Sequence, residues 1–311
     1  MNENPTTVQA AVAVLAHLMR DNVRANLILR HRLKQALREF LAVNEFVEFD
    51  TPVLGGRIDE YPAGHIKAEL SDGRQLWLAQ SPQLHKQMLI ASGYERYMQF
   101  AHCFREEHAS DRRDCLREFI QVDFEMVTER AEDVRLVVER MFAAVCARFG
   151  VPVITPFPVI DADECIRRYG TDRPDLRHTP DELAFLWVVD FPLATREDGE
   201  IRLVRHPMAR PMRTPTDLED ALTIRTHSYD LVLNGYEVAS GDLRIHRAQE
   251  QEAVLRAMGL EVGRFGDLLD TLAAGCPPHG GFGLGLDRLA MRLAGEDDVA
   301  EVTAFPVWSG R

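Results

Sequence analysis

The sequence has no signature of export, membrane insertion or cysteine-based metal binding. No basic-then-apolar segment opens it, and no apolar run reaches the roughly 18 residues that a membrane span needs. Its five cysteines are scattered and contain no C-x-x-C pair, which argues against a disulfide framework or a zinc site. We therefore expect a soluble, cytoplasmic protein that has no membrane partner.

Basic residues are also scarce relative to acidic ones. The chain has 36 Lys and Arg against 49 Asp and Glu, a formal net charge of −13. Such a field repels polyanions, which excludes a nonspecific nucleic-acid coat protein but leaves room for a local basic patch. Hydrophobic residues make up 46% of the 311 residues, enough for one large core.

Periodicity predicts strands that outnumber the βαβ units. Strand-like runs rarely alternate with helical ones, which favours an α+β fold with a mostly antiparallel sheet and helices packed on it. A helix is expected to start after Ser81 as N-cap. The other predicted elements are helices at 22–43 and 131–149, strands at 46–52, 97–104, 118–126, 229–238 and 281–286, and a hairpin within 64–80.

The stretch G-F-G-L-G-L-D-R-L, residues 281–289, resembles a phosphate loop only at first sight. Its spacing is G-x-G-x-G and no Lys follows, so it matches neither the Rossmann fingerprint nor the P-loop. Alternating glycines leave one face of a strand bare, so that a flat ligand can lie on the backbone. Arg288 can then stack its guanidinium on that ligand. Alternatively, the segment is a core strand that its glycines weaken, and Arg288 forms a surface ion pair.

A second arginine-rich segment makes the pattern specific. F-R-E-E-H-A-S-D-R-R-D-C-L-R-E-F-I-Q-V-D-F-E-M, residues 104–126, and the glycine stretch resemble motifs 2 and 3 of the class II aminoacyl-tRNA synthetases, and F-D-T-P resembles the end of motif 1. S-P-Q-L-H-K-Q, R-H-P-M and Y-D-L-V-L-N-G-Y-E-V-A-S-G-D-L-R-I-H resemble the catalytic domain of aspartyl-tRNA synthetases. The resemblance covers about residues 25–306.

The resemblance implies activation of an amino acid by ATP. Arg105 matches the arginine that bridges the substrate carboxylate and the α-phosphate, a role that suits its forked donors. Phe119 and Arg288 match the two residues that sandwich adenine. Glu107 matches the residue that recognises the edge of adenine. Mg²⁺ is implied as cofactor beside ATP, because hard oxygen donors suit that ion. The implied catalytic residues are Arg105, Glu237 and Arg288, the other ATP-binding residues Glu107, Phe119 and Gly285, and the metal ligands Glu237 and Ser240.

The resemblance also implies an aspartate pocket. Lys86 and Arg244 match two cations that hold the side-chain carboxylate, and asparagine would leave that buried charge uncompensated. Asp123 matches the acid that orients Lys86. The remaining implied aspartate-binding residues are Glu60, Gln83 and His206.

Four departures from that family concern the domain organisation and the pocket. Residues 1–20 are too short for the anticodon-binding barrel, and an inserted domain after 168–177 is missing, so we expect one catalytic domain over 1–311 with an N-terminal extension. Arg205 replaces a histidine. Asp242 adds an acid close to Arg244. The tRNA acceptor end, if it is a partner, is expected at Arg112, Arg113 and Arg117.

Three functions of different classes therefore compete, one of them a structural partner of a true synthetase. The first is an enzyme that forms aspartyl-adenylate from L-aspartate, or a close analogue, and passes it to tRNA, ammonia, another amine or a carrier protein. The alternative is a non-catalytic regulatory paralogue that binds aspartate or ATP. A complete set of α-phosphate and metal residues favours the enzyme. Motif 1, residues 22–52, forms the two-fold interface in the family, so a homodimer is expected.

Overall fold

The computed structural model describes residues 7–56, 64–106 and 112–306. Its centre is an eight-stranded sheet in the order β1-β5-β6-β13-β12-β11-β8-β7, antiparallel except for the two edge pairs. The strands are β1 (Val47–Glu48), β5 (Arg96–Phe104), β6 (Glu118–Val127), β13 (His279–Gly285), β12 (Tyr236–Leu243), β11 (Ser228–Leu233), β8 (Phe185–Val189) and β7 (Val159–Asp161). The expected α+β architecture is confirmed.

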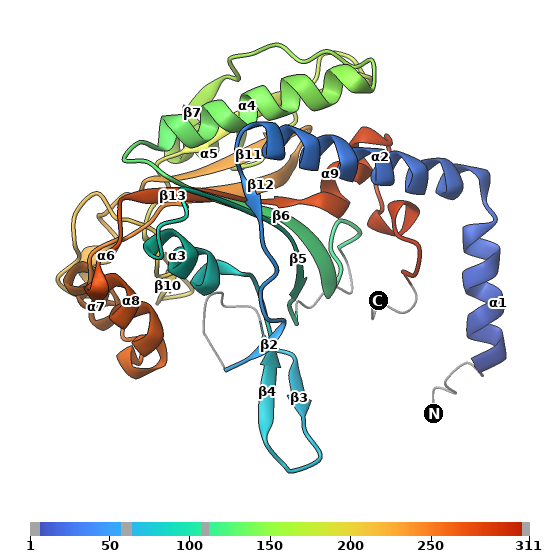
Figure 1. Cartoon of the computed structure of the whole chain (residues 1–311). Coiled ribbons are helices and arrows are strands. Elements are labelled where there is room, and N and C mark those ends of the chain that lie inside the picture. Colours follow the sequence, from blue (N-terminus) through green and yellow to red (C-terminus); the bar gives the residue numbers. More distant parts are fainter. Residues whose placement is uncertain (1–6, 57–63, 107–111, 307–311) are drawn as a thin grey trace.

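Helices cover one face of this sheet, where α2 (Asp21–Val43), α4 (Ala131–Arg148) and α9 (Leu286–Leu293) lie above it in Figure 1. The main core fills the space between them, and Trp187, Phe124 and Phe282 meet there. The opposite face is covered only in part. The elements on that side are α3 (Gln83–Ala91), α6 (Leu218–Ala221), α7 (Ala248–Ala257), α8 (Gly266–Ala274) and the β9–β10 ribbon (Ala194–Glu197, Glu200–Leu203).

The small elements complete the chain. A three-stranded ribbon projects below the sheet in Figure 1, and α1 forms an arm at one side. These elements are α1 (Thr7–Leu18), β2 (Leu54–Gly55), β3 (Lys67–Glu69), β4 (Gln75–Leu78), α5 (Ala162–Tyr169) and the 3₁₀ turns η1 (Val262–Phe265) and η2 (Val299–Val302). Among the described residues no helix is both long and apolar enough to cross a membrane. All five cysteines are free thiols.

Most predicted elements are confirmed, and three need correction. The strand expected at 46–52 shortens to β1. Ser81 is not the N-cap, since Pro82 occupies that place while the Ser81 hydroxyl accepts from the Gln83 N–H at 3.1 Å. The single strand expected at 229–238 is a hairpin of β11 and β12. Asn234 and Gly235 form its turn with φ of 51° and 85°, the left-handed values that an Asn-Gly pair adopts readily.

Candidate active site

A cavity of about 330 Å³ lies on the face of the sheet opposite α2 and α4. Residues from β6, β12, β13, α3 and α9 line it, so segments far apart in sequence contribute to one site. It gathers nearly all the residues expected from the sequence: Gln83, Lys86, Arg105, Phe119, Asp123, His206, Glu237, Ser240, Arg244, Gly285 and Arg288. The expected residues Glu60 and Glu107 lie outside the described residues.

The bare strand β13 makes room for two carboxylates. Phe282 and Leu284 face the core, which leaves the alternating glycines on the cavity side. A Cβ at Gly281 would lie 1.8 Å from Glu125 Oε2, and one at Gly283 would lie 3.3 Å from Asp123 Oδ2. The glycines therefore let acids on β6 reach across β13, besides leaving space for a ligand.

The two expected cations, Lys86 and Arg244, are paired with those acids. Lys86 Nζ lies 2.6 Å from Asp123 Oδ1 and 3.1 Å from Glu125 Oε2. Arg244 Nε and Nη2 donate to the two oxygens of Glu125 at 2.9 and 3.3 Å. Glu125 thus joins a lysine on α3 to an arginine that follows β12, and all four side chains are buried.

Burial and the cations compete in setting the charge of these acids. Burial alone disfavours the ionised form of Glu125, but Arg244 and Lys86 together outweigh it and hold its pKa below the usual value. Burial raises the pKa of Asp123, although Lys86 opposes the shift. Glu125 is therefore the acid whose charged form both cations stabilise.

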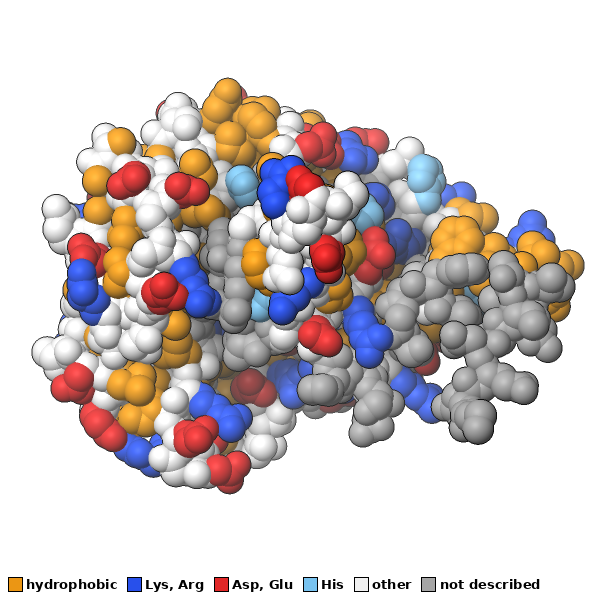
Figure 2. Space-filling view, turned by 90° about the horizontal axis from the view of Figure 1, so that it is seen from below, with side chains coloured by type: hydrophobic (Ala, Val, Ile, Leu, Met, Phe, Trp, Pro, Cys, Tyr) orange, Lys and Arg blue, Asp and Glu red, His pale blue; other side chains and the backbone are white. Residues whose placement is uncertain are grey.

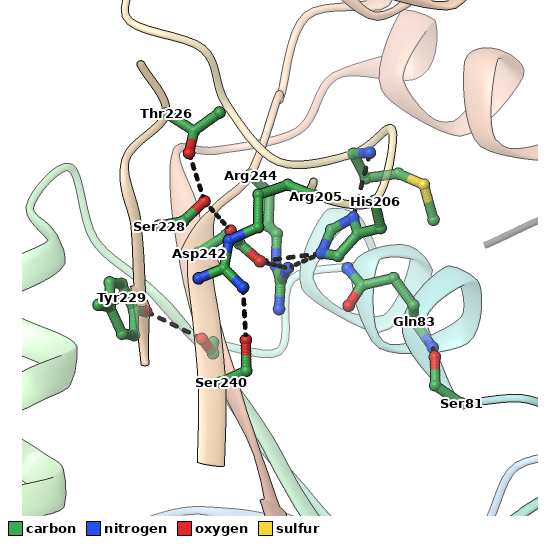
Figure 3. A network of polar contacts seen from close by, with 12 residues as sticks. Ser81, Gln83, Arg205, His206, Thr226, Ser228, Tyr229, Ser240, Asp242 and Arg244 are labelled. Carbon is green, nitrogen blue, oxygen red and sulfur yellow. Dashed lines mark hydrogen bonds and ion pairs between the residues drawn. The ribbon is translucent and has the colours of Figure 1, made fainter. Parts of the chain in front are cut away.

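Asp242 is a third acid at this end of the cavity (Figure 3). Its Oδ2 accepts from Arg244 Nη1 at 3.0 Å and lies 2.9 Å from His206 Nε2. Its Oδ1 accepts from the hydroxyl of Ser228, on the neighbouring strand β11. Burial opposes ionisation of Asp242, yet the surrounding donors outweigh it and hold its pKa well below the usual range.

The tautomer of His206 follows from its neighbours. The backbone N–H of Met208 donates to Nδ1 at 3.2 Å, which puts the hydrogen of a neutral ring on Nε2, 2.9 Å from Asp242 Oδ2. Nε2 also lies 2.6 Å from Arg244 Nη1, so two donor groups meet beside the Asp242 carboxylate. Burial lowers the pKa of His206; Asp242 opposes this shift, and the cations Arg244 and Lys86 add to it. The imidazole is therefore neutral near pH 7.

A β-bulge brings the two expected metal ligands to one face. In regular pairing, residues three apart point to opposite faces of a strand. The β11–β12 register shifts at Val238, so Val238 and Ala239 both pack in the core while Glu237 and Ser240 both line the cavity. Carboxylate and hydroxyl oxygens suit Mg²⁺, so this pair fits the implied ion.

Arg205 and Asp230 form a buried pair beside those ligands. Arg205 Nη2 donates to Asp230 Oδ1 at 2.6 Å, and Nη1 donates to Ser240 Oγ at 3.2 Å, as Figure 3 shows for Ser240. Burial, with the neighbouring Glu237 carboxylate, raises the pKa of Asp230 to about 7 although Arg205 opposes the shift. Asp230 thus places a further oxygen donor near Ser240.

The opposite end of the cavity is richer in arginine. Arg288 donates to the carbonyl oxygen of Glu237, and its Nη2 lies 3.2 Å from Asp114 Oδ2. The guanidinium of Arg105 lies over the ring of Phe119, 5.2 Å from its centroid. These side chains form a half-open, cationic and aromatic surface.

The three arginines expected to meet an acceptor differ in position. Arg112 lines the cavity and pairs with Asp114 at 2.8 Å, whereas Arg113 and Arg117 are exposed beyond its described lining. The carbonyl of Arg113 accepts from the N–H of Val299. The segment is therefore tied to the body of the protein by its backbone, with side chains directed to solvent.

Sequence reasoning missed Glu125, Asp230 and the Gln87–His279 pair. Glu125 follows Asp123 by two residues on a predicted strand, a spacing that places both on one face. Asp230 has the same relation to Ser228 on β11. His279 accepts at Nε2 from Gln87 at 3.2 Å and donates from Nδ1 to the carbonyl of Pro277 at 2.8 Å. No spacing rule indicates that last contact.

This sheet and its cavity define the fold of the class II synthetases, and comparison with known proteins agrees. The chain belongs to the family "tRNA synthetases class II (D, K and N)", whose model matches residues 8–309. The structure resembles asparaginyl-tRNA synthetase from Pyrococcus horikoshii complexed with asparaginyl-adenylate, with a TM-score of 0.76 and 21% identity over 97% of this chain and 72% of that one. At this identity the likeness concerns the fold.

Curated relatives are named aspartate–tRNA ligases. The "Aspartate--tRNA ligase" of Geobacillus kaustophilus is 30% identical, over 93% of this chain and 72% of the relative. The "Aspartate--tRNA(Asp/Asn) ligase" of Dictyoglomus turgidum is 28% identical, over 93% and 71% respectively. The latter alignment spans 427 positions against the 311 residues here, so long segments of the relative fall opposite gaps.

Proposed function

We propose that this protein activates L-aspartate, or a close analogue, with ATP to form aspartyl-adenylate and pyrophosphate, and then transfers the aminoacyl group. One observation carries the proposal: a single cavity joins a buried pair of cations, Lys86 and Arg244, to a surface with Arg105, Phe119 and Arg288. The first end suits the polar side chain of the amino acid, and the second suits a triphosphate and a purine.

In this reaction an oxygen of the amino-acid carboxylate attacks the α-phosphorus and pyrophosphate leaves. The protein contributes position and charge, with little covalent chemistry of its own. Arg105 is placed to neutralise charge on both reacting groups, and Phe119 to support the base. Glu237 and Ser240 would hold Mg²⁺, which supplies charge neutralisation on the phosphates when bound.

The test is isotope exchange between pyrophosphate and ATP with each amino acid in turn. We expect exchange that depends on aspartate or a derivative of its side chain. Exchange with none of the twenty amino acids, together with retained binding of aspartate, would favour the regulatory alternative. Arg105→Ala should abolish exchange without unfolding the protein, because Arg105 lies at the half-open end of the cavity.

We also propose that adenylate formation is efficient while charging of tRNA is weak. Support comes from the net charge of −13 and from the described surface in Figure 2, where basic and acidic side chains lie interspersed. The expected division, a single catalytic domain over 1–311, stays a prediction. Ammonia, an amine or a carrier protein then competes with tRNA as acceptor.

Paired variants separate the acceptors. Arg113→Ala with Arg117→Ala should remove any RNA aminoacylation while exchange continues, because neither side chain lines the described cavity. Arg140→Ala with Arg148→Ala on α4 removes the same charge on the other side of the sheet and serves as control. Efficient, anticodon-dependent charging that both double variants retain would contradict the proposal.

We propose a homodimer formed by α2 and β1. Ile28, Val43 and Val47 are large apolar side chains left exposed on these two elements, with 83% exposure at Val43. A self-complementary two-fold contact would bury them. Analytical ultracentrifugation at micromolar concentration should give a dimer, and Val43→Asp with Val47→Asp should give a monomer. A monomeric wild-type protein would refute this arrangement.

A further inference from the structure

Asp242 adds a third acid to the two cations, Lys86 and Arg244, at the amino-acid end of the cavity. Among the described residues, the cations there are Lys86 and Arg244, and the acids are Asp123, Glu125 and Asp242. His206 is a neutral donor, and the adjacent Arg205 and Asp230 pair with each other. A substrate carboxylate would therefore approach two buried cations that three protein carboxylates already face.

On this basis, and resting on the proposed function, we infer that Asp242 determines specificity. Of the substrates that the proposed function leaves open, its carboxylate disfavours L-aspartate, with a charged β-carboxylate, and favours the close analogue that has an uncharged β-carboxamide, the side chain of asparagine. Asp242 contacts no reacting group, so it acts through Arg244.

The donors of Arg244 are the first step in this argument. A guanidinium has five N–H groups. Nε and Nη2 donate to Glu125, and Nη1 donates to Asp242, so three nitrogen atoms already face protein carboxylates. Two acids thus neutralise one cation, and a third negative group would approach against their repulsion.

The rigidity of Asp242 is the second step. The side chain is buried, it receives hydrogen bonds from Ser228, His206 and Arg244, and its pKa is held low. Neither protonation nor movement into solvent relieves its charge. Asp242 itself lines the cavity, so its charge faces a bound substrate.

The chemistry of the amide is the third step. A carboxylate only accepts hydrogen bonds, whereas a carboxamide both accepts through oxygen and donates through nitrogen. Its oxygen can use the remaining N–H groups of Lys86 or Arg244, and its N–H groups can meet the carboxylates of Asp242 or Asp123, which both line the cavity. A pocket lined by both hydrogen-bond donors and acceptors therefore suits the oxygen and the nitrogen of the carboxamide.

The test compares equilibrium binding of aspartate and asparagine by calorimetry, in the presence of a non-hydrolysable ATP analogue. Asp242→Asn keeps the shape and removes the charge, and Asp242→Ser is the second variant in case the first does not fold. In either variant the affinity ratio of aspartate to asparagine should rise at least about tenfold over wild type. The affinity for the ATP analogue should stay within about twofold.

Two controls isolate the charge at this position. Glu200→Gln removes one negative charge on the exposed ribbon strand β10, and Ser228→Ala removes a hydrogen bond from Asp242 without changing charge. Both should leave the ratio within about twofold of wild type. A ratio that stays constant in the folded Asp242 variants, or one that Ser228→Ala moves equally, would overturn the inference. Absence of pyrophosphate exchange would refute the proposed activity alone, because binding is measured separately.

Discussion

The two ends of the cavity are built in opposite ways. At the amino-acid end, the side chains of Lys86 and Glu125 are 2% and 0% exposed, and each contacts at least two charged partners. At the opposite end, where we propose that the nucleotide binds, the side chains of Arg288 and Arg112 are 20% and 45% exposed. Charge interactions weaken steeply as water approaches.

Because of this difference, we expect the buried end to select the substrate and the half-open end to attract it. A buried, fully paired network cannot rearrange cheaply, so it discriminates between small substrates that differ by one charge. A half-open arginine surface attracts an anion such as a triphosphate and tolerates adjustment. Substitutions at the two ends should therefore impair different properties, the binding of the amino acid at one end and that of ATP at the other.

The largest effect on stability should come from a substitution in β13, whose alternating glycines face the cavity. Gly281→Ala places a methyl group against Glu125 and the backbone of Phe124, so the ion network must break or β13 must shift. We expect a loss of about 3 kcal/mol or more in the free energy of unfolding and no amino-acid binding. Gly283→Ala meets Asp123 at a milder 3.3 Å and should cost about 1 kcal/mol. Urea denaturation of both variants checks this order; equal losses would contradict it.

A pair of variants should separate the ends kinetically. Lys86→Met leaves Asp123 and Glu125 short of a cation and should raise the KM for the amino acid about a hundredfold, with the KM for ATP little changed. Arg288→Ala should do the reverse, raising the KM for ATP about tenfold. Steady-state exchange kinetics measure both constants. If each variant raises both KM values alike, the division between the ends is wrong.

The effect that is smallest at neutral pH concerns His279, since its contribution changes only as the pH falls. Burial lowers the pKa of His279 from 6.5 to about 4. Between these values the unfolded state binds the extra proton, so this contribution to stability is full above about pH 6.5 and is lost as the pH falls toward 4. The loss amounts to at most about 3 kcal/mol. His279→Gln should flatten the dependence of unfolding free energy on pH in that window, and an unchanged slope would contradict the assignment.

Local sequence patterns predicted the elements better than their connections. The helical spacing of 22–43 matches α2 closely, because an amphipathic period shows which face is buried. The sequence predicts a single strand across the Asn234-Gly235 turn, because both flanking segments have strand-like patterns. The dipeptide itself is a strong hairpin signal. Pairing partners, unlike period, depend on residues distant in the chain.

The sequence by itself determined the family, the helical and strand periods and most of the residues that meet in the cavity, because these depend on local spacing and ordered motifs. Only the tertiary structure decided which charges compensate each other. Glu125 reaches Arg244 across Gly281, and Asp242 shares that arginine with it. Strand order and a bulge set these distances, and in a buried site the distance and the count of charges decide which side chain is accepted.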